Sequence, residues 1–470
     1  MTLVRATWGL ALLLGGCSLV PAQDVSWCVT NPESAARVGH PVGTLVERDG
    51  PTWVAARRAG EAGNPCGHDS SVDDAGPLPD GSPEDSGLDA APAPDGGADA
   101  GVDAAADAGP PPPPLDPYRV IATGWVHTCV IFEGDVYCWG DNEHGQLGNG
   151  GGPDSSRPVP VTGLPSDIVE VSATGYFSCA LASSGQVWCW GINTYGQLGD
   201  RTTDTRRAPV RAMGVEAVRI TAGGEGVCAL HGDGSISCWG RGDGGALGQG
   251  ELRNSMTPVG VIGLDGPALG VEGSGGHYCA RLATDSVACW GWNRNGQLGR
   301  AFDGSNELIP TPVQPRGLAD VRLASAGGRH TCVRAGDSMA CWGWNMFGQL
   351  GNGTGPDTHT PVIVGGLDSP ADDLSAGGSH TCALLESGDV YCWGGNAMGQ
   401  LGVGDTMERG APARVSGFTA GVLQVSTGDF HTCAALSTGD VACWGGNFEG
   451  QLGTGNTDNS LTPAIIDIEP

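Results

Sequence analysis

Lysine is absent from this chain of 470 residues, so all 23 basic residues are arginine. They are outnumbered by 52 acidic residues, which gives a formal net charge of -29. A protein with this net negative charge repels phosphate backbones and anionic lipid headgroups. The composition therefore argues against DNA, RNA or an anionic membrane surface as a partner.

Long apolar runs are also missing. The apolar run from Trp8 to Leu14 is too short to span a bilayer. It follows Arg5 and leads into Leu-Gly-Gly-Cys17, which resembles the lipobox of bacterial lipoproteins. We expect a signal peptide at 1–16 and lipidation of Cys17, with ordinary secretion as the alternative. Ser18 resembles the sorting residue of lipoproteins sent to the outer membrane, so a lipid anchor at the outer membrane or cell surface is expected.

Recognisable catalytic motifs are lacking too. No nucleophile, base and orienting group share a motif, and no glycine-rich phosphate loop follows a strand and opens a helix. We therefore expect no enzymatic activity, no catalytic residues and no cofactor.

Hydrophobic residues are scarce from 69 to 117, which is almost entirely Asp, Ala, Gly, Pro and Ser. Such a segment cannot offset the entropy of ordering, so a disordered acidic tether is predicted. The tether follows a small head at 17–68, in which Cys28 and Cys66 are able to form one bridge.

What the chain does contain is a repeat. The phrase Cys-Trp-Gly, followed by Gly-Gln-Leu-Gly, recurs at a period of about 51 residues. Its tryptophans are Trp139, Trp190, Trp239, Trp290, Trp342, Trp393 and Trp444. Each copy has four short extended runs, which in the second copy are 158–161, 168–173, 177–182 and 187–190. This pattern predicts an all-β, seven-bladed β-propeller at 118–470.

The first copy lacks the Pro-Val run, whereas the chain ends on a matching segment at 462–466. We predict that this C-terminal strand completes the first blade and closes the ring, which would remove open sheet edges. The propeller is expected to be a monomer.

Fourteen of the 17 cysteines fall two per copy, nine or ten residues apart. The shorter spacing goes with a two-residue turn and the longer with a three-residue turn, so each pair should lie directly opposite across a hairpin. The predicted bridges join Cys129 to Cys138, Cys179 to Cys189, Cys228 to Cys238, Cys279 to Cys289, Cys332 to Cys341, Cys382 to Cys392 and Cys433 to Cys443.

Metal binding is the alternative for these cysteines, because His127, His330, His380 and His431 stand two residues before the first cysteine of a pair. Close C-x-x-C spacing is absent, however, and no metal site is expected. Phe177 and Gly226 replace the histidine in the second and third copies, which favours a packing or hydrogen-bonding role.

Together, Gly-x-x-His-Thr-Cys-Ala-Leu and Cys-Trp-Gly-x-Asn-x-x-Gly-Gln-Leu-Gly resemble the regulator of chromosome condensation repeat family of seven-bladed propellers. The third copy departs at Gly242 and Ala246, where the family has Asn and Gln. The resemblance implies the fold. By analogy it also implies a guanine-nucleotide-exchange regulator, although a shared propeller does not transfer that activity.

Side chains in the loop after the repeated tryptophan differ from copy to copy. Equivalent loops of a ring lie on one face, so they are expected to form a partly apolar crescent that binds a protein. The alternative is that they pack on neighbouring blades. The crescent residues are Tyr195, Trp292, Trp344, Met346, Phe347, Met398 and Phe448.

The sequence thus favours an envelope-anchored, non-enzymatic scaffold that binds an unidentified protein. A carbohydrate-binding propeller is the second hypothesis, although a glycan partner would predict similar loop residues in every copy.

Overall fold

The computed structural model describes residues 26–28, 45–49, 52–55, 119–301, 308–353 and 355–468, which belong to two separate units. In the first unit, β1 (Ser26–Cys28), β2 (Leu45–Asp49) and β3 (Thr52–Ala55) form a three-stranded antiparallel sheet in that order. Cys17, Cys66 and the 69–117 tether lie outside the described residues. Lipidation, the bridge from Cys28 and the tether therefore stay predictions.

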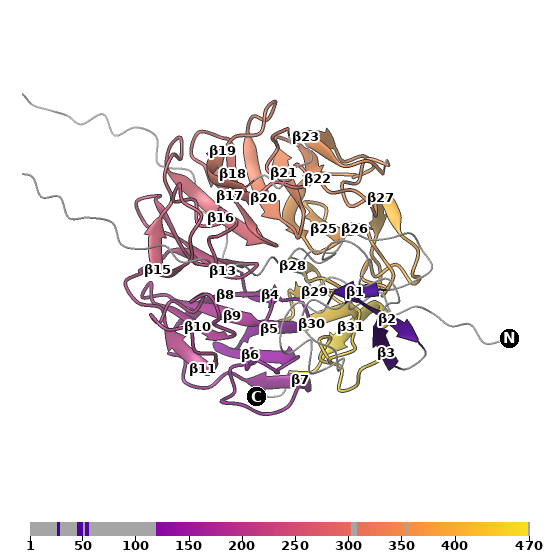
Figure 1. Ribbon diagram of the computed structural model, residues 1–470. Helices are drawn as coiled ribbons and strands as arrows, with labels where there is room; N and C mark the ends of the chain where they lie inside the picture. The colour runs from indigo at the N-terminus through magenta and orange to yellow at the C-terminus, as the bar shows by residue number, and fades with distance from the viewer. Residues whose placement is uncertain are drawn as a thin grey trace, which may run out of the picture. The chain divides into compact units, whose positions relative to one another are not determined.

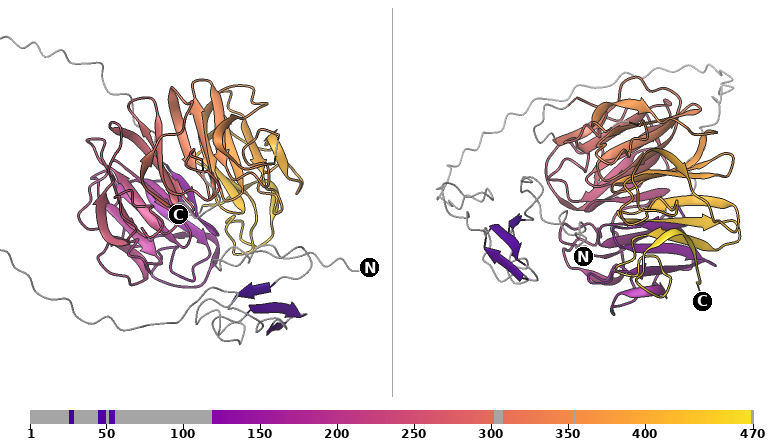
Figure 2. Two further views of the ribbon diagram at one scale, coloured as in Figure 1. Left: turned by 45° about the horizontal axis from the view of Figure 1, so that its top comes forward. Right: turned by 90° about the vertical axis from the view of Figure 1, so that its right-hand side faces the viewer.

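In the second unit, the described residues from 119 to 468 form seven four-stranded antiparallel sheets and no helix. Figure 1 shows the sheets arranged around a central axis, with the first strand of each innermost and the fourth at the rim. The two further views in Figure 2 show that the blades form a ring with two broad faces. The predicted all-β, seven-bladed propeller is confirmed.

The strand bounds follow the repeat. Blade 1 consists of β4 (Ile121–Thr123), β5 (His127–Phe132), β6 (Asp135–Gly140) and β7 (Ser155–Pro160), and blade 2 of β8 (Ile168–Thr174), β9 (Phe177–Ala182), β10 (Val187–Gly191) and β11 (Arg206–Arg211). Blade 3 consists of β12 (Arg219–Gly223), β13 (Gly226–Leu230), β14 (Ile236–Gly240) and β15 (Ser255–Gly260), and blade 4 of β16 (Ala268–Ser274), β17 (His277–Leu282), β18 (Val287–Trp292) and β19 (Leu308–Val313). Blade 5 consists of β20 (Val321–Ala326), β21 (His330–Ala335), β22 (Ser338–Gly343) and β23 (Thr358–Ile363), and blade 6 of β24 (Ala371–Ala376), β25 (His380–Leu385), β26 (Val390–Gly394) and β27 (Arg409–Arg414). Blade 7 consists of β28 (Val422–Thr427), β29 (His431–Leu436), β30 (Val441–Gly445) and β31 (Ser460–Ile466).

The predicted pairing of the C-terminal strand is wrong. β31 pairs with β30 in blade 7, with Cys443 opposite Ala464, and blade 1 takes its outer strand β7 from the chain that follows β6. The Pro-Val run thus ends a blade and does not begin one. Its prolines explain the position, because a residue without a backbone N–H is tolerated at a sheet edge.

Ring closure therefore depends on side-chain packing between blades 7 and 1. Ile466 and Ile468 pack in one cluster with Ile121 and Trp139. Trp139 Nε1 also donates a hydrogen bond to the backbone oxygen of Gln451 at 2.9 Å. The equivalent bond joins every other pair of neighbouring blades, so the closing contact is of the same kind as the other six.

The apolar core of the propeller is divided into seven clusters, each lying between two neighbouring blades of the described residues. Every cluster contains the two cysteines of one blade and the repeated tryptophan of the next. In one of them, Cys382 and Cys392 of blade 6 pack with Trp444 of blade 7, and all three are fully buried. No blade therefore has a core without its neighbour.

The seven predicted bridges within the propeller are confirmed among the described residues. Their cysteines are direct register partners on the second and third strands, with Cα atoms 4.1 or 4.2 Å apart. The seven disulfides are consistent with an extracellular location. The described residues include no helix that is long and apolar enough to cross a membrane.

Candidate functional site

The loop between the third and fourth strands is held by Asn and Gln side chains that point into it. In blade 5, Asn345 Oδ1 accepts a hydrogen bond from Leu350 N at 3.0 Å, and Gln349 Oε1 accepts one from Phe347 N at 3.0 Å. The same two bonds recur in blades 1, 2, 4, 6 and 7. The two residues that follow the Asn are thereby left on the surface of the loop.

Blade 3 keeps a similar loop although it lacks both side chains. Asn254 Oδ1 accepts hydrogen bonds from Gly242 N at 2.9 Å and Asp243 N at 3.2 Å, which holds the loop from its far end. Ala246 still supplies the backbone oxygen that accepts from Trp290 Nε1. The framework therefore survives the departure from the repeat.

The turns between the first and second strands emerge at the same end of the blades as these loops. Backbone bonds join the two sets, as from Trp344 N to Arg329 O at 2.9 Å and from Gly446 N to Phe430 O at 2.8 Å. We call the surface made by these turns and loops the Asn-loop face. It is the surface on which the repeated framework presents residues that are not repeated.

All seven predicted crescent residues lie on the Asn-loop face, but they differ in exposure. Met346 is 65% exposed and Phe448 is 43% exposed. The other five are half-buried: Tyr195, Trp292, Trp344, Phe347 and Met398. Packing on neighbours therefore accounts for part of this set, whereas Met346 and Phe448 present a large part of an apolar side chain to solvent.

The half-buried members make aromatic and cation–π contacts. The Trp344 and Phe347 rings meet edge to face with centroids 5.2 Å apart. The Arg241 guanidinium carbon lies 5.0 Å from the Tyr195 ring centroid and 5.9 Å from that of Trp292. These contacts connect the crescent from blade 2 to blade 4.

Sequence reasoning missed the residues of the first turn, which extend the surface toward the axis. Trp125 and Tyr176 meet edge to face at 5.2 Å, and Phe430 meets Phe448 at 6.0 Å. The Arg329 guanidinium lies 5.4 Å above the Trp344 ring. The signal was present in the sequence, because the residue before each repeated His position varies between copies as the loop residues do.

The buried histidines connect neighbouring blades by hydrogen bonds. His380 Nε2 lies 2.8 Å from Thr432 Oγ1, and that hydroxyl donates its hydrogen to Gln400 O at 2.8 Å. The histidine must then donate from Nε2, so its buried Nδ1 is bare and without a partner. Burial accordingly lowers the pKa of His380 to about 3. The paired cysteines are bonded to each other, and the described residues contain no cluster of three potential metal ligands.

Where the histidine is replaced, its partner in the next blade changes with it. Phe177 of blade 2 packs in one cluster with Val227 of blade 3, which stands where Thr432 stands in blade 7. Tyr278 of blade 4 faces Gly226 of blade 3, and its hydroxyl donates to Gly223 O at 2.8 Å. These positions are therefore framework.

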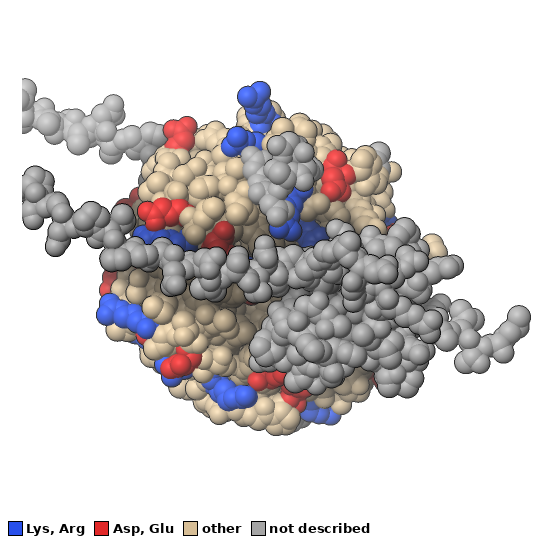
Figure 3. Space-filling view, viewed as in Figure 1, with Lys and Arg blue, Asp and Glu red and all other residues tan. Residues whose placement is uncertain are grey.

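Carboxylates gather on the Asn-loop face where blade 7 meets blade 1. Burial, followed by the nearby charges of Asp141, Asp154 and Glu143, raises the pKa of Glu449 above its usual value. Elsewhere, Figure 3 shows basic and acidic side chains interspersed over the exposed part of the view. The sector of blades 7 and 1 on the Asn-loop face thus holds a group of carboxylates, with Arg207 beside it, whose Nη2 donates a hydrogen bond to Glu143 O at 3.2 Å.

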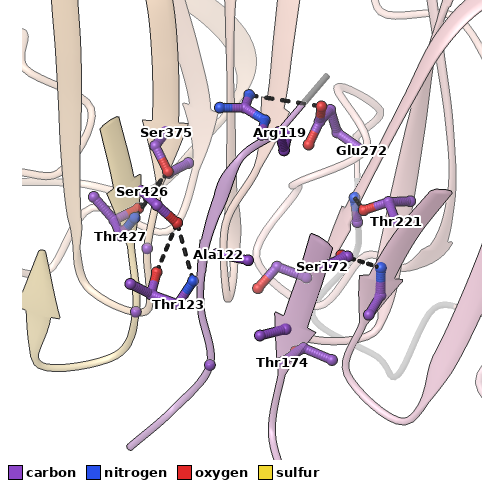
Figure 4. Close-up of a pocket in the computed structure, with 18 of the residues that line it drawn as sticks. Arg119, Ala122, Thr123, Ser172, Thr174, Thr221, Glu272, Ser375, Ser426 and Thr427 are labelled. Carbon is purple, nitrogen blue, oxygen red and sulfur yellow. Dashed lines mark hydrogen bonds and ion pairs between the residues drawn. The ribbon is translucent and has the colours of Figure 1, made fainter. Parts of the chain in front are cut away.

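The ring encloses a central channel of about 90 Å³ that is lined mainly by Ser, Thr, Gly and Ala of the inner strands. Hydroxyl groups join adjacent strands here, as between Ser426 Oγ and both Thr123 N (3.1 Å) and Thr123 Oγ1 (2.9 Å) (Figure 4). Figure 4 also shows Arg119 reaching toward Glu272, and the same guanidinium contacts Asp373 at 3.0 Å.

The repeated sequence of this chain also matches known proteins. Two sequence profiles of the Regulator of chromosome condensation (RCC1) repeat match, the first at 133–181, 184–230, 285–334, 341–384 and 387–435 and the second at 119–146, 168–197, 371–400 and 422–451. The Ultraviolet-B receptor UVR8 of Arabidopsis thaliana is 32% identical over 358 residues, which cover 74% of this chain and 81% of UVR8. The E3 ubiquitin-protein ligase HERC2 of Homo sapiens is 28% identical over 362 residues, which cover 75% of this chain but 6% of HERC2.

Solved structures share the fold. A chain in the crystal structure of Kap60 bound to yeast RCC1 (Prp20) aligns with a TM-score of 0.65 at 23% identity, covering 71% of this chain and 84% of that chain. Human WBSCR16 aligns with a TM-score of 0.61 at 25% identity, covering 67% of this chain and 86% of that chain.

Proposed function

The chain belongs to the regulator of chromosome condensation repeat family, and on that premise we propose that it is a non-enzymatic, protein-binding scaffold anchored in the cell envelope. The proposed binding surface is the Asn-loop face. The tether and the lipid anchor at Cys17 are part of the proposal and come from the sequence alone.

The observation that carries the proposal is the contrast between framework and surface on one face. The Trp, Asn and Gln of the loops are buried and repeated, whereas the side chains between them change from blade to blade. Tryptophan, tyrosine and arginine predominate at the centres of protein interfaces. Trp292, Trp344 and Arg329 are of this composition, and Met346 and Phe448 add exposed apolar area.

The differences among the blades also favour one asymmetric partner. A propeller that bound glycans at every blade would need the same aromatic and polar set seven times. Trp292 and Trp344 share this position, but the other five blades instead have Asp141, Ile192, Arg241, Gly395 and Gly446 there. Gsp1p and histones are bound by the yeast protein Prp20p, and those partners belong to that protein and are not proposed for this chain.

The test is affinity capture from envelope extract and culture medium with the oxidised full chain. A variant with Trp292→Ala, Trp344→Ala and Phe347→Ala removes the crescent in blades 4 and 5. A control variant with Met213→Ala and Ile363→Ala removes two exposed apolar side chains, 43% and 63% exposed, away from this face.

We expect a protein retained by the wild type and the control and lost by the crescent variant, with all three equally folded by circular dichroism. Equal retention by all three would refute the Asn-loop face as the binding surface. Release of the bound material by simple sugars would support the glycan hypothesis in its place.

A further inference from the structure

All four cation–π contacts among the described residues lie on the Asn-loop face, from blade 2 to blade 5. Arg241 makes two of them, but it also forms ion pairs with Glu225 and with Asp243, whose Oδ1 lies 2.7 Å from Arg241 Nε. Arg294 and Arg329 are different. Their guanidinium carbons lie 5.6 Å from the Trp292 ring and 5.4 Å from the Trp344 ring, and neither forms an ion pair with the described residues.

These two Arg–Trp pairs belong to one continuous patch. Trp292 lies on Gly276, where an added Cβ would come within 3.0 Å of the ring. The neighbouring Gly275 is so close to Gly328 of blade 5 that a Cβ would come within 2.1 Å of its carbonyl oxygen. Arg329 follows Gly328 directly. We call Trp292, Arg294, Arg329 and Trp344 the Arg–Trp sector.

One acidic group faces this sector from another blade. Asp429 of blade 7 is half-buried, and Arg329 lowers its pKa while burial raises it to about 7. Arg329 forms no ion pair with this carboxyl, so its guanidinium remains available to a carboxylate of a partner.

We infer that the Arg–Trp sector binds a short acidic segment of a protein partner, in which one or two carboxylates are flanked by apolar side chains. This inference rests on the proposed function and specifies the chemistry of the partner. A guanidinium pairs with a carboxylate through two parallel hydrogen bonds. The indole beneath the guanidinium orients it and can also pack against apolar side chains that flank the carboxylate in the partner. The two arginines offer this arrangement on adjacent blades.

A short segment fits better than a polyanion. The chain carries a net charge of -29, and the acidic sector of Asp141, Glu143 and Glu449 lies on the same face in blades 1 and 7. A nucleic acid or a sulfated glycan that crossed the face would be repelled there, whereas a short acidic segment can lie on the Arg–Trp sector without reaching those carboxylates.

The experiment uses an array of synthetic twelve-residue peptides that alternate Asp or Glu with Leu, Pro or Phe, each beside its Asn or Gln counterpart. The best peptide is then titrated by fluorescence anisotropy against the oxidised full chain. The test variant is Arg294→Gln with Arg329→Gln. The matched control is Arg211→Gln with Arg316→Gln, which removes two exposed arginines at the opposite end of the blades.

We expect the acidic peptide to bind at least tenfold more tightly than its amide counterpart, and the test variant to lose that advantage while the control keeps it. Equal binding of the acidic and amide peptides, or equal loss in both variants, would overturn the inference. Self-association that the test variant abolishes would also overturn it, because the occupant would then be a second copy.

The two proposals fail separately. If the natural partner is still captured through Trp292 and Trp344 but is indifferent to Arg294→Gln and Arg329→Gln, the binding face stands and its acidic specificity does not.

Discussion

Acid is expected to destabilise the propeller through its buried histidines. Burial lowers the pKa of His127, His277, His330, His380 and His431 to about 3, against roughly 6.5 in an unfolded chain. Between these values the unfolded chain binds protons at the five rings that the folded chain does not. Their contribution to stability is thus fully present above pH 6.5 and is lost as the pH falls toward 3.

The magnitude follows from the size of these shifts. Each ring should lower the free energy of unfolding by about 2 kcal/mol between pH 7 and pH 5, or about 10 kcal/mol for all five. Carboxyls with a raised pKa act in the opposite direction, chiefly Glu170 and Asp429, because burial raises the pKa of Glu170 to about 8 and that of Asp429 to about 7. Their contribution grows as the pH falls and offsets about half of the loss. The expected net loss is on the order of 5 kcal/mol.

A single substitution tests the cause. In His380→Phe, Thr432 keeps its bond to Gln400 O but loses the histidine donor, so the variant should be about 1 kcal/mol less stable at pH 7. At pH 5 the wild type has lost about 2 kcal/mol because the unfolded chain protonates His380, whereas the variant has no ring to protonate. The variant should then be about 1 kcal/mol more stable than the wild type. The double variant with Thr432→Val copies the Phe177 and Val227 pair and should recover part of the loss at pH 7.

The assay is urea unfolding of the oxidised chain at pH 7 and pH 5, followed by tryptophan fluorescence and far-ultraviolet circular dichroism. A difference between His380→Phe and wild type that keeps its sign at both pH values would refute the reasoning. A wild-type stability that does not change between pH 7 and pH 5 would do the same.

Three further outcomes are expected. Trp139→Phe and Trp393→Phe should each lower stability by about 1 to 3 kcal/mol, because both lose an indole bond to a neighbouring blade. A negligible effect at Trp139 alone, measured by urea unfolding, would argue against the closed ring. Deletion of 461–470 should lower the melting temperature by removing most of β31 and the packing of Ile466 and Ile468 between blades 7 and 1, and a truncation that melts like the full chain would contradict that packing. Reduction should cost about 2 to 3 kcal/mol per bridge, and free thiols among the cysteines from Cys129 to Cys443 in non-reducing mass spectrometry would contradict the pairing.

Much of the fold could be predicted because its determinants are local and repeated. The spacing of Cys129 and Cys138 fixes a hairpin that places them opposite each other, and the same arithmetic holds in every blade. The phase of the repeat could not be read in this way. In the sequence, the Pro-Val run stands between the last strand of one copy and the first strand of the next, so it could pair with either. In the structure the chain turns back through the Asn loop, and the run pairs with the strand before it.

The candidate site was predicted in part for a similar reason. Position in the repeat placed Trp292 and Trp344 on the correct face, since equivalent residues occupy equivalent places in a ring. Exposure depends on neighbours from other blades, so Met346 and the half-buried Phe347 could not be distinguished in advance. The stacking of Arg329 on Trp344 joins two segments of one blade that are separate in sequence, and no local pattern encodes it.

Each of the seven junctions between blades contains the same indole-to-carbonyl hydrogen bond, which makes the propeller suitable for circular permutation. Since β31 completes its own blade and the contact of blade 7 with blade 1 uses the same Trp-to-carbonyl bond as the others, the closing junction is not structurally distinct from the rest. A short peptide that joins Ile468 to Arg119 would stand in for the ordinary connection between one blade and the next. The chain could then be opened between any other two blades, and the circularly permuted protein would be left with the same seven cores.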